Sequence, residues 1–109
     1  MIKNDRRISQ RFQGKPSNYI QYTEGSGRIR DLSLEGVFVL DPEPLPAGTK
    51  IAFSLHLDTQ DVPLTGIVRR SMPGEGMAIL FTDLSAEAKR RIKIQIAGLV
   101  AAPEGAPKR

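Results

Sequence analysis

The stretch KIAFSLHL, residues 50–57, alternates an apolar residue with a polar or small one along its whole length. Successive side chains of a β-strand point to opposite faces, so this pattern predicts a strand with one buried face. Residues 62–68 and 77–81 repeat the alternation, and residues 37–40 form a short apolar run suited to a central strand. Turn-forming residues separate these runs. The pattern therefore predicts an all-β domain, a small closed or nearly closed antiparallel barrel without exposed edges.

After residue 81 the apolar spacing changes to that of an α-helix, in the residues Ala88, Ile92, Ile96 and Leu99. Ser85 is suited to cap the first turn of this helix, Glu87 complements its dipole, and Pro103 would end it. The basic residues Lys89, Arg90 and Lys93 lie on the other side, either as a docking surface or as ordinary solvated charge. We expect residues 1–14 to be a flexible N-terminal arm, residues 15–102 to hold the barrel and helix, and residues 103–109 to be a disordered tail.

The composition limits the chemistry that this chain can perform. Its 109 residues suit one domain, and the lack of cysteine excludes disulfides and thiolate nucleophiles. Neither an apolar membrane span nor a signal peptide is visible, so we expect a cytoplasmic protein. His56 has no partner nucleophile or ligand cluster in the sequence, and we expect an ordinary surface residue. No phosphate-binding loop, activated serine or carboxylate pair is present, so we expect neither an enzyme nor a catalytic cofactor or metal.

Two short motifs remain. Arg7 and Arg11 form R-x-x-x-R in the basic N-terminal segment, where a plain solvated arm is the alternative interpretation. Asp31, Ser33 and Gly36 form the rarer D-x-S-x-x-G. Its alternative interpretation is a turn at a strand end, in which the aspartate and serine bond local backbone groups and the glycine supplies a positive φ.

The order and setting of the two motifs are informative. An apolar strand follows the second motif directly, the late strand GMAILF lies at residues 76–81, and the amphipathic helix comes last. In this arrangement the sequence resembles the PilZ domain family over residues 6–100. The resemblance implies a six-stranded antiparallel β-barrel with a C-terminal helix, which binds the bacterial messenger cyclic di-GMP through both motifs.

The residue types of the two motifs suit this ligand, a dianion with two guanine bases. An arginine can bond phosphate or the guanine O6 and N7 atoms with two parallel bonds, and it can stack on a purine. Asp31 can accept from the guanine N1–H and N2–H groups, Ser33 can add a hydroxyl bond, and Gly36 leaves space under the ligand. Relatives with an arginine at the position of Arg6 are associated with two mutually intercalated ligand molecules, so the resemblance implies such a dimer here.

We therefore predict a cyclic di-GMP receptor whose N-terminal arm becomes ordered over the barrel on binding and which signals to a partner protein in trans. Two alternatives stay open. The net charge of +4 also suits a small barrel that binds nucleic acid, although only 6% of the residues are aromatic and such barrels stack bases on aromatic side chains. The second alternative is a PilZ adaptor that no longer binds the nucleotide.

Overall fold

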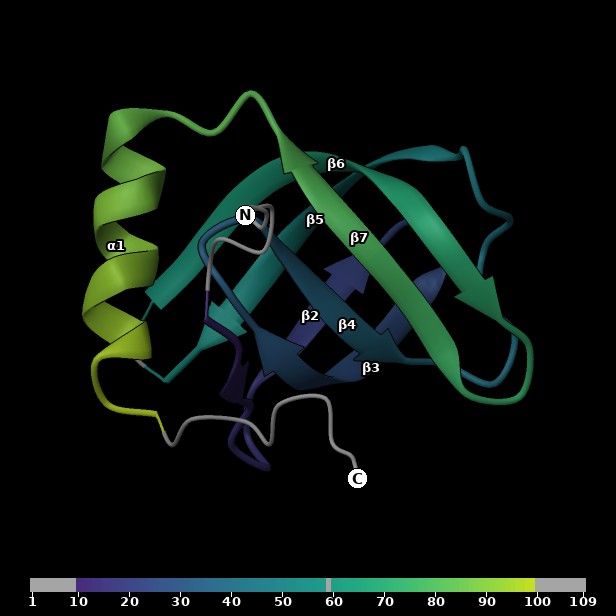
Figure 1. Ribbon diagram of the computed structural model, residues 1–109, viewed down its shortest axis with the longest axis horizontal. Helices are drawn as coiled ribbons and strands as arrows, with labels where there is room; N and C mark the ends of the chain where they lie inside the picture. Colours follow the sequence, from purple (N-terminus) through teal and green to yellow (C-terminus); the bar gives the residue numbers. More distant parts are fainter. Residues whose placement is uncertain (1–9, 59, 100–109) are drawn as a thin grey trace, which may run out of the picture.

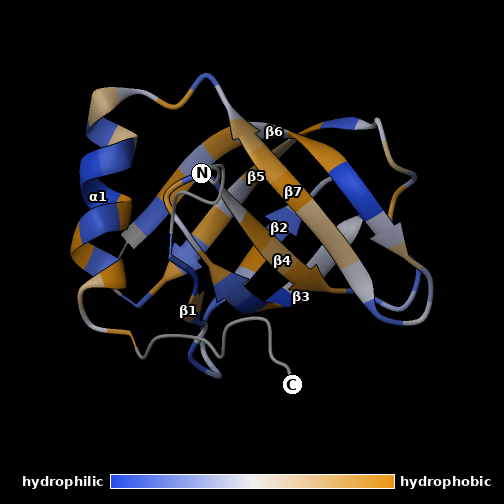
Figure 2. Ribbon diagram, in the orientation of Figure 1, coloured by the Kyte–Doolittle hydropathy of each residue, from blue (hydrophilic) through white to orange (hydrophobic). Residues whose placement is uncertain are grey.

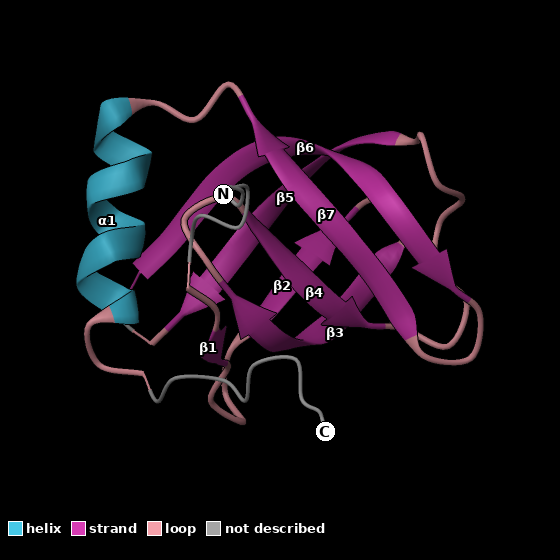
Figure 3. Ribbon diagram, in the orientation of Figure 1, coloured by secondary structure: helices cyan, strands magenta, loops and turns pink. Residues whose placement is uncertain are grey.

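The computed structural model of the protein describes residues 10–58 and 60–99 (Figures 1 and 3). In this part of the chain seven strands precede one helix. They are β1 (Phe12–Gln13), β2 (Tyr19–Tyr22), β3 (Gly25–Leu32), β4 (Gly36–Leu40), β5 (Lys50–Leu57), β6 (Gln60–Met72), β7 (Gly76–Thr82) and α1 (Ala86–Ile96). The predicted six-stranded antiparallel barrel with a C-terminal helix is confirmed, with β1 as one additional strand.

The barrel closes between β3 and β4. The strands follow one another in the order β3-β2-β5-β6-β7-β4, every neighbouring pair is antiparallel, and β4 pairs back with β3. The additional strand β1 pairs with the end of β3 that β2 leaves free, where Phe12 lies opposite Leu32 and Gln13 opposite Asp31. The start of the described chain is therefore attached to the strand that carries Asp31.

The N-terminal arm that we predicted for residues 1–14 is described only from residue 10. Within that part, β1 is already a member of the sheet, and the Gly14 amide donates a hydrogen bond of 3.0 Å to the Arg30 carbonyl. The last residues of the predicted arm therefore pair with the barrel, while Arg6 and Arg7 lie outside the described residues.

The predicted alternation fills the barrel with apolar side chains. In β5, Ile51, Phe53, Leu55 and Leu57 are all buried, and polar residues alternate with them along the strands (Figure 2). The helix α1 lies at one end of the barrel and adds three buried side chains to the same core, those of Ala88, Ile92 and Ile96 (Figure 1). One continuous core therefore connects the helix to the strands.

The start of α1 agrees with the prediction from the sequence, and its end does not. Ser85 caps the helix as predicted, because its hydroxyl accepts a hydrogen bond of 3.0 Å from the Ala88 amide. The helix ends at Ile96, well before Pro103, so the expectation that the proline ends it is wrong. The following amides of Gly98 and Leu99 bond to carbonyls three residues back instead. Glycine lowers helix stability by about 1 kcal/mol relative to alanine, which explains the earlier end.

Tyr22 connects β2 to the loop that follows β4. Its hydroxyl donates a hydrogen bond to the Asp41 carboxylate, and only 6% of the residue is exposed. The other Asp41 carboxylate oxygen accepts from the Glu43 amide at 2.9 Å. Burial, together with the hydrogen bond to Asp41 and its negative charge, raises the pKa of Tyr22 above its ordinary value.

We expect Tyr22→Phe to reduce the free energy of unfolding by about 1 kcal/mol at neutral pH, because Asp41 loses a buried hydrogen-bond donor. The unfolded chain ionises this tyrosine near pH 10, whereas the folded protein keeps it protonated. The Tyr22 hydroxyl therefore contributes fully to the free energy of unfolding below about pH 10, and this contribution is lost as the pH rises further. The stability difference between wild type and variant should narrow accordingly. Urea unfolding between about pH 8 and pH 11 tests this. A constant difference over that range would contradict it.

Candidate functional site

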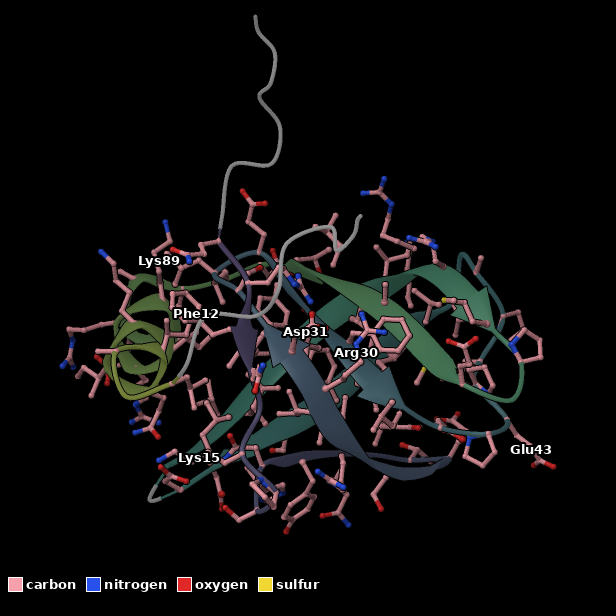
Figure 4. All side chains as sticks on the ribbon, turned by 60° about the horizontal axis from the view of Figure 1, so that its bottom comes forward. Phe12, Lys15, Arg30, Asp31, Glu43 and Lys89 are labelled. Atoms are coloured by element: carbon pink, nitrogen blue, oxygen red, sulfur yellow. The ribbon has the colours of Figure 1, made fainter. Side chains whose placement is uncertain are left out.

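A β-bulge decides which residues of β3 reach the outer face of the barrel. The register of β3 against β4 shifts between Ile29 and Asp31, so Arg30 is the extra residue. Ile29 and Leu32 both belong to the core although they are three positions apart, which regular alternation does not allow. The bulge resolves this conflict and leaves Arg30 and Asp31 side by side on the outer face (Figure 4).

Arg11 joins the two sequence motifs at this place. Its Nε donates a hydrogen bond of 2.7 Å to Asp31 Oδ1, a residue 20 positions away in the chain. One terminal guanidinium nitrogen donates to Ser33 Oγ at 3.1 Å, and the other donates to the Asp31 carbonyl at 3.4 Å. The adjacent Phe12 pairs with Leu32 and packs against the core, so β1 holds Arg11 in position.

The Asp31 carboxylate lies between two arginines. Arg11 bonds its Oδ1 atom, and the Arg30 Nε donates to its Oδ2 atom at 2.7 Å. The Asp31 side chain is only 11% exposed, whereas those of Arg11 and Arg30 are 37% and 53% exposed. A largely buried carboxylate with one arginine on each oxygen therefore holds two charge-assisted hydrogen bonds at the surface of the barrel.

Ser33 holds the turn between β3 and β4. Its hydroxyl accepts from the amides of Glu35 and Gly36, at 3.1 and 3.2 Å, as well as from Arg11. A hydroxyl has two acceptor lone pairs, so these three donors already exceed its capacity. The local bonding that the turn interpretation predicts is therefore present at Ser33, whereas the Asp31 carboxylate bonds arginine side chains instead. A donor group of a ligand can therefore bond this hydroxyl oxygen only where Arg11 withdraws.

Gly36 does not have the positive φ that the turn interpretation predicts, and this part of the prediction is wrong. Among the described glycines, positive φ angles occur at Gly48 and Gly74. A Cβ atom on Gly36 would lie 2.3 Å from the Ile79 carbonyl oxygen in β7. The close approach of β7 therefore explains why this position lacks a side chain, without any role for a ligand.

Comparison with known protein families identifies the domain. A family model for the PilZ domain matches residues 3–98. The chain belongs to the PilZ domain family. PilZ domains bind cyclic di-GMP and act as nucleotide receptors rather than as catalysts. None of the curated proteins matches this sequence.

Two grooves flank the paired arginines of this PilZ domain. One, of about 200 Å³, extends from Arg11 across Gly36 and Ala78 to Arg69 on β6. The other, of about 370 Å³, lies along β3 and includes Arg28 and Arg30 among its lining residues. A larger groove of about 470 Å³ lies on the outer side of β5 and β6 and contains no residue of either motif. Residues of both motifs therefore line these two grooves, together with other arginines.

Arg30 and Phe38 belong to the site, although neither forms part of a sequence motif. The Arg30 Cζ atom lies 3.9 Å from the centre of the Phe38 ring. Phe38 pairs with Asp31 and points outward, since its neighbours Val37 and Val39 fill the core. In the sequence it stands within an uninterrupted apolar run, so only the register of β4 shows that it faces outward.

His56 lies on the outer face of β5, as expected, and two other side chains contact it there. Its Nδ1 atom lies 2.7 Å from an Asp61 carboxylate oxygen, and its ring stacks on Tyr19 with the ring centres 4.3 Å apart. Across residues 10–58 and 60–99, no group of three or more possible metal ligands comes together. The same part of the chain contains no helix long and apolar enough to cross a membrane.

The packing of Gly36 against β7 can be tested by stability alone. We expect Gly36→Ala to lower the free energy of unfolding by about 1–3 kcal/mol, because the new methyl group collides with a backbone carbonyl. Gly25→Ala is the matched control, since nothing lies within 4 Å of its added Cβ. The control should change stability by less than about 0.5 kcal/mol. Equal stability of the two variants in urea unfolding would show that β7 tolerates the methyl group.

Proposed function

We propose that this chain binds cyclic di-GMP on the outer face of β3 and β4. The residues that bind it are Arg6, Arg7, Arg11, Asp31 and Ser33, with Gly36 shaping the turn beneath. The observation that supports this most strongly is the Arg11 guanidinium, which bridges the Asp31 carboxylate and the Ser33 hydroxyl. It brings half of the first motif into contact with the second at a surface lined by further arginines.

In this proposal the ligand binds by exchange. The Asp31 carboxylate accepts from the N1–H and N2–H groups of a guanine in place of Arg11, whose guanidinium then turns to a phosphate or to the guanine O6 and N7 atoms. A hydrogen bond to a charged group contributes about 1.5–3 kcal/mol. The ligand must therefore form more such bonds than the Arg11 contacts it replaces, which favours a ligand with both guanine edges and phosphates.

The proposal extends to the N-terminal segment and to signalling. Arg6 and Arg7 would complete the cationic side of the site, and ordering of their segment over the barrel would change the surface shown to a partner protein in trans. Fixing the backbone costs about 1–2 kcal/mol per residue, so each arginine of the segment must contribute substantially. A ligand in the form of an intercalated dimer would supply four guanines and four phosphate charges for these contacts.

Isothermal titration with cyclic di-GMP tests the proposed ligand and site. We expect Arg11→Ala and Asp31→Ala to weaken binding about ten- to hundredfold, because each removes charge-assisted bonds to the ligand. Lys89→Ala removes one positive charge from helix α1, outside both motifs, and should bind like the wild type. No heat with the wild type would refute the receptor. Unchanged affinity in both site variants would instead refute the site, and tighter binding of random oligonucleotides would favour a nucleic-acid-binding barrel.

The same titration measures the stoichiometry. If Arg6 helps to neutralise and stack a second nucleotide, the wild type should take up two molecules per chain and Arg6→Ala only one. Arg6→Lys is the informative companion, because it keeps the charge and loses the planar group. One molecule per wild-type chain would contradict the dimer while leaving the site itself intact.

A further inference from the structure

Arg30 is held on two sides by the fold. Its Nε bonds the largely buried Asp31 carboxylate at 2.7 Å, and its Cζ atom lies over the Phe38 ring at 3.9 Å. Both partners are rigidly placed, since Phe38 is 5% exposed and stands opposite Asp31 in the β3–β4 register. The Arg30 side chain itself remains 53% exposed. The guanidinium thus has a ring beneath it, a carboxylate at its edge and solvent access on the remaining side.

This arrangement holds the Arg30 guanidinium in place as a flat cationic surface. A free arginine side chain samples many rotamers, and binding normally has to immobilise it. Here the contact with the aromatic ring and the ion pair already restrict it before any ligand arrives. A planar guanidinium can stack on a purine with the face that is turned away from a supporting ring. Phe38 therefore has a physical role on the outer surface of the barrel, as the support for Arg30.

The two arginines that bond Asp31 differ in this respect. Arg11 shares its guanidinium between Asp31 and the Ser33 hydroxyl, and within the described residues it forms no cation–π pair. Arg30 has the ring as well as the carboxylate. Displacement of Arg11 by a ligand breaks hydrogen bonds to Asp31 and Ser33, whereas displacement of Arg30 breaks one bond to Asp31 and the contact with Phe38. In the proposed exchange Arg11 is the arginine that withdraws, and Arg30 is the one that stays.

We propose that Arg30 is a ligand-binding residue that stacks on a purine base of the bound nucleotide, supported from below by Phe38 and fixed at its edge by Asp31. The inference rests on the proposed nucleotide site and adds to it a base-stacking position outside both motifs. Charge alone cannot fill this role, because a lysine at the same place keeps the ion pair with Asp31 and offers no planar surface.

The substitution Arg30→Lys separates the effect of stacking from that of charge. We expect it to weaken cyclic di-GMP binding about tenfold, in line with the loss of one base stack. The dependence of affinity on salt should stay as in the wild type, because the number of positive charges is unchanged. Arg91→Lys is the matched control, since Arg91 also pairs with a carboxylate, that of Glu87 on the helix, at 3.0 Å. Its affinity should stay within about twofold of the wild type.

A double-mutant cycle tests the supporting role of Phe38. Phe38→Leu keeps an apolar side chain under Arg30 and removes the flat ring. It should weaken binding in the wild-type background and have little further effect beside Arg30→Lys, because both changes disturb the same stack. Urea unfolding confirms that each variant is folded at the titration temperature.

The outcomes distinguish this inference from the proposed function. A wild type that does not bind the nucleotide refutes both. A wild type that binds, with Arg30→Lys indistinguishable from it, refutes the stacking residue alone. Additive effects of Phe38→Leu and Arg30→Lys would show that the two side chains act separately, and this would overturn the supported stack.

Discussion

The β-bulge at Arg30 allows two residues of β3 that are three positions apart to enter the core together. Ile29 and Leu32 must both enter the core, and a regular strand would turn one of them to solvent. With one extra residue between the two sections of the strand, both enter, and Arg30 and Asp31 face outward together. The bulge lies where β3 pairs with β4 and closes the barrel. The site is therefore a consequence of how the barrel closes.

Closure also gives the two arginines around Asp31 different contacts. Arg30 belongs to β3 and is held over the ring of Phe38, which β4 supplies. Arg11 precedes the short strand β1, and its hold on the site consists of hydrogen bonds to Asp31 and Ser33. In our proposal Arg30 provides a surface for a base, and Arg11 exchanges with a ligand donor. This division of roles suits a receptor, in which a ligand replaces contacts that the protein makes with itself.

The second motif combines structural and chemical roles that are difficult to separate by mutation. Ser33 bonds the backbone of its own turn, and Gly36 allows β7 to approach, so both support the fold in the absence of any ligand. Asp31 differs, because the bulge turns its carboxylate to the outer surface. Loss of binding in a Gly36 variant would therefore reflect the β4–β7 contact, whereas loss in an Asp31 variant would report on the site.

Much of this protein follows from local sequence. Alternation in residues 50–57 determines a strand with one buried face, and Ser85 determines where the helix begins, because each of these signals depends on near neighbours in the chain. The bulge, the outward direction of Phe38 and the contact of Gly36 with Ile79 are decided by the tertiary structure. Each depends on which residues of distant strands lie opposite one another, and this register is set by the core as a whole. The contact of Arg30 with the ring of Phe38, eight positions later in the chain, exists because β3 and β4 pair where the barrel closes.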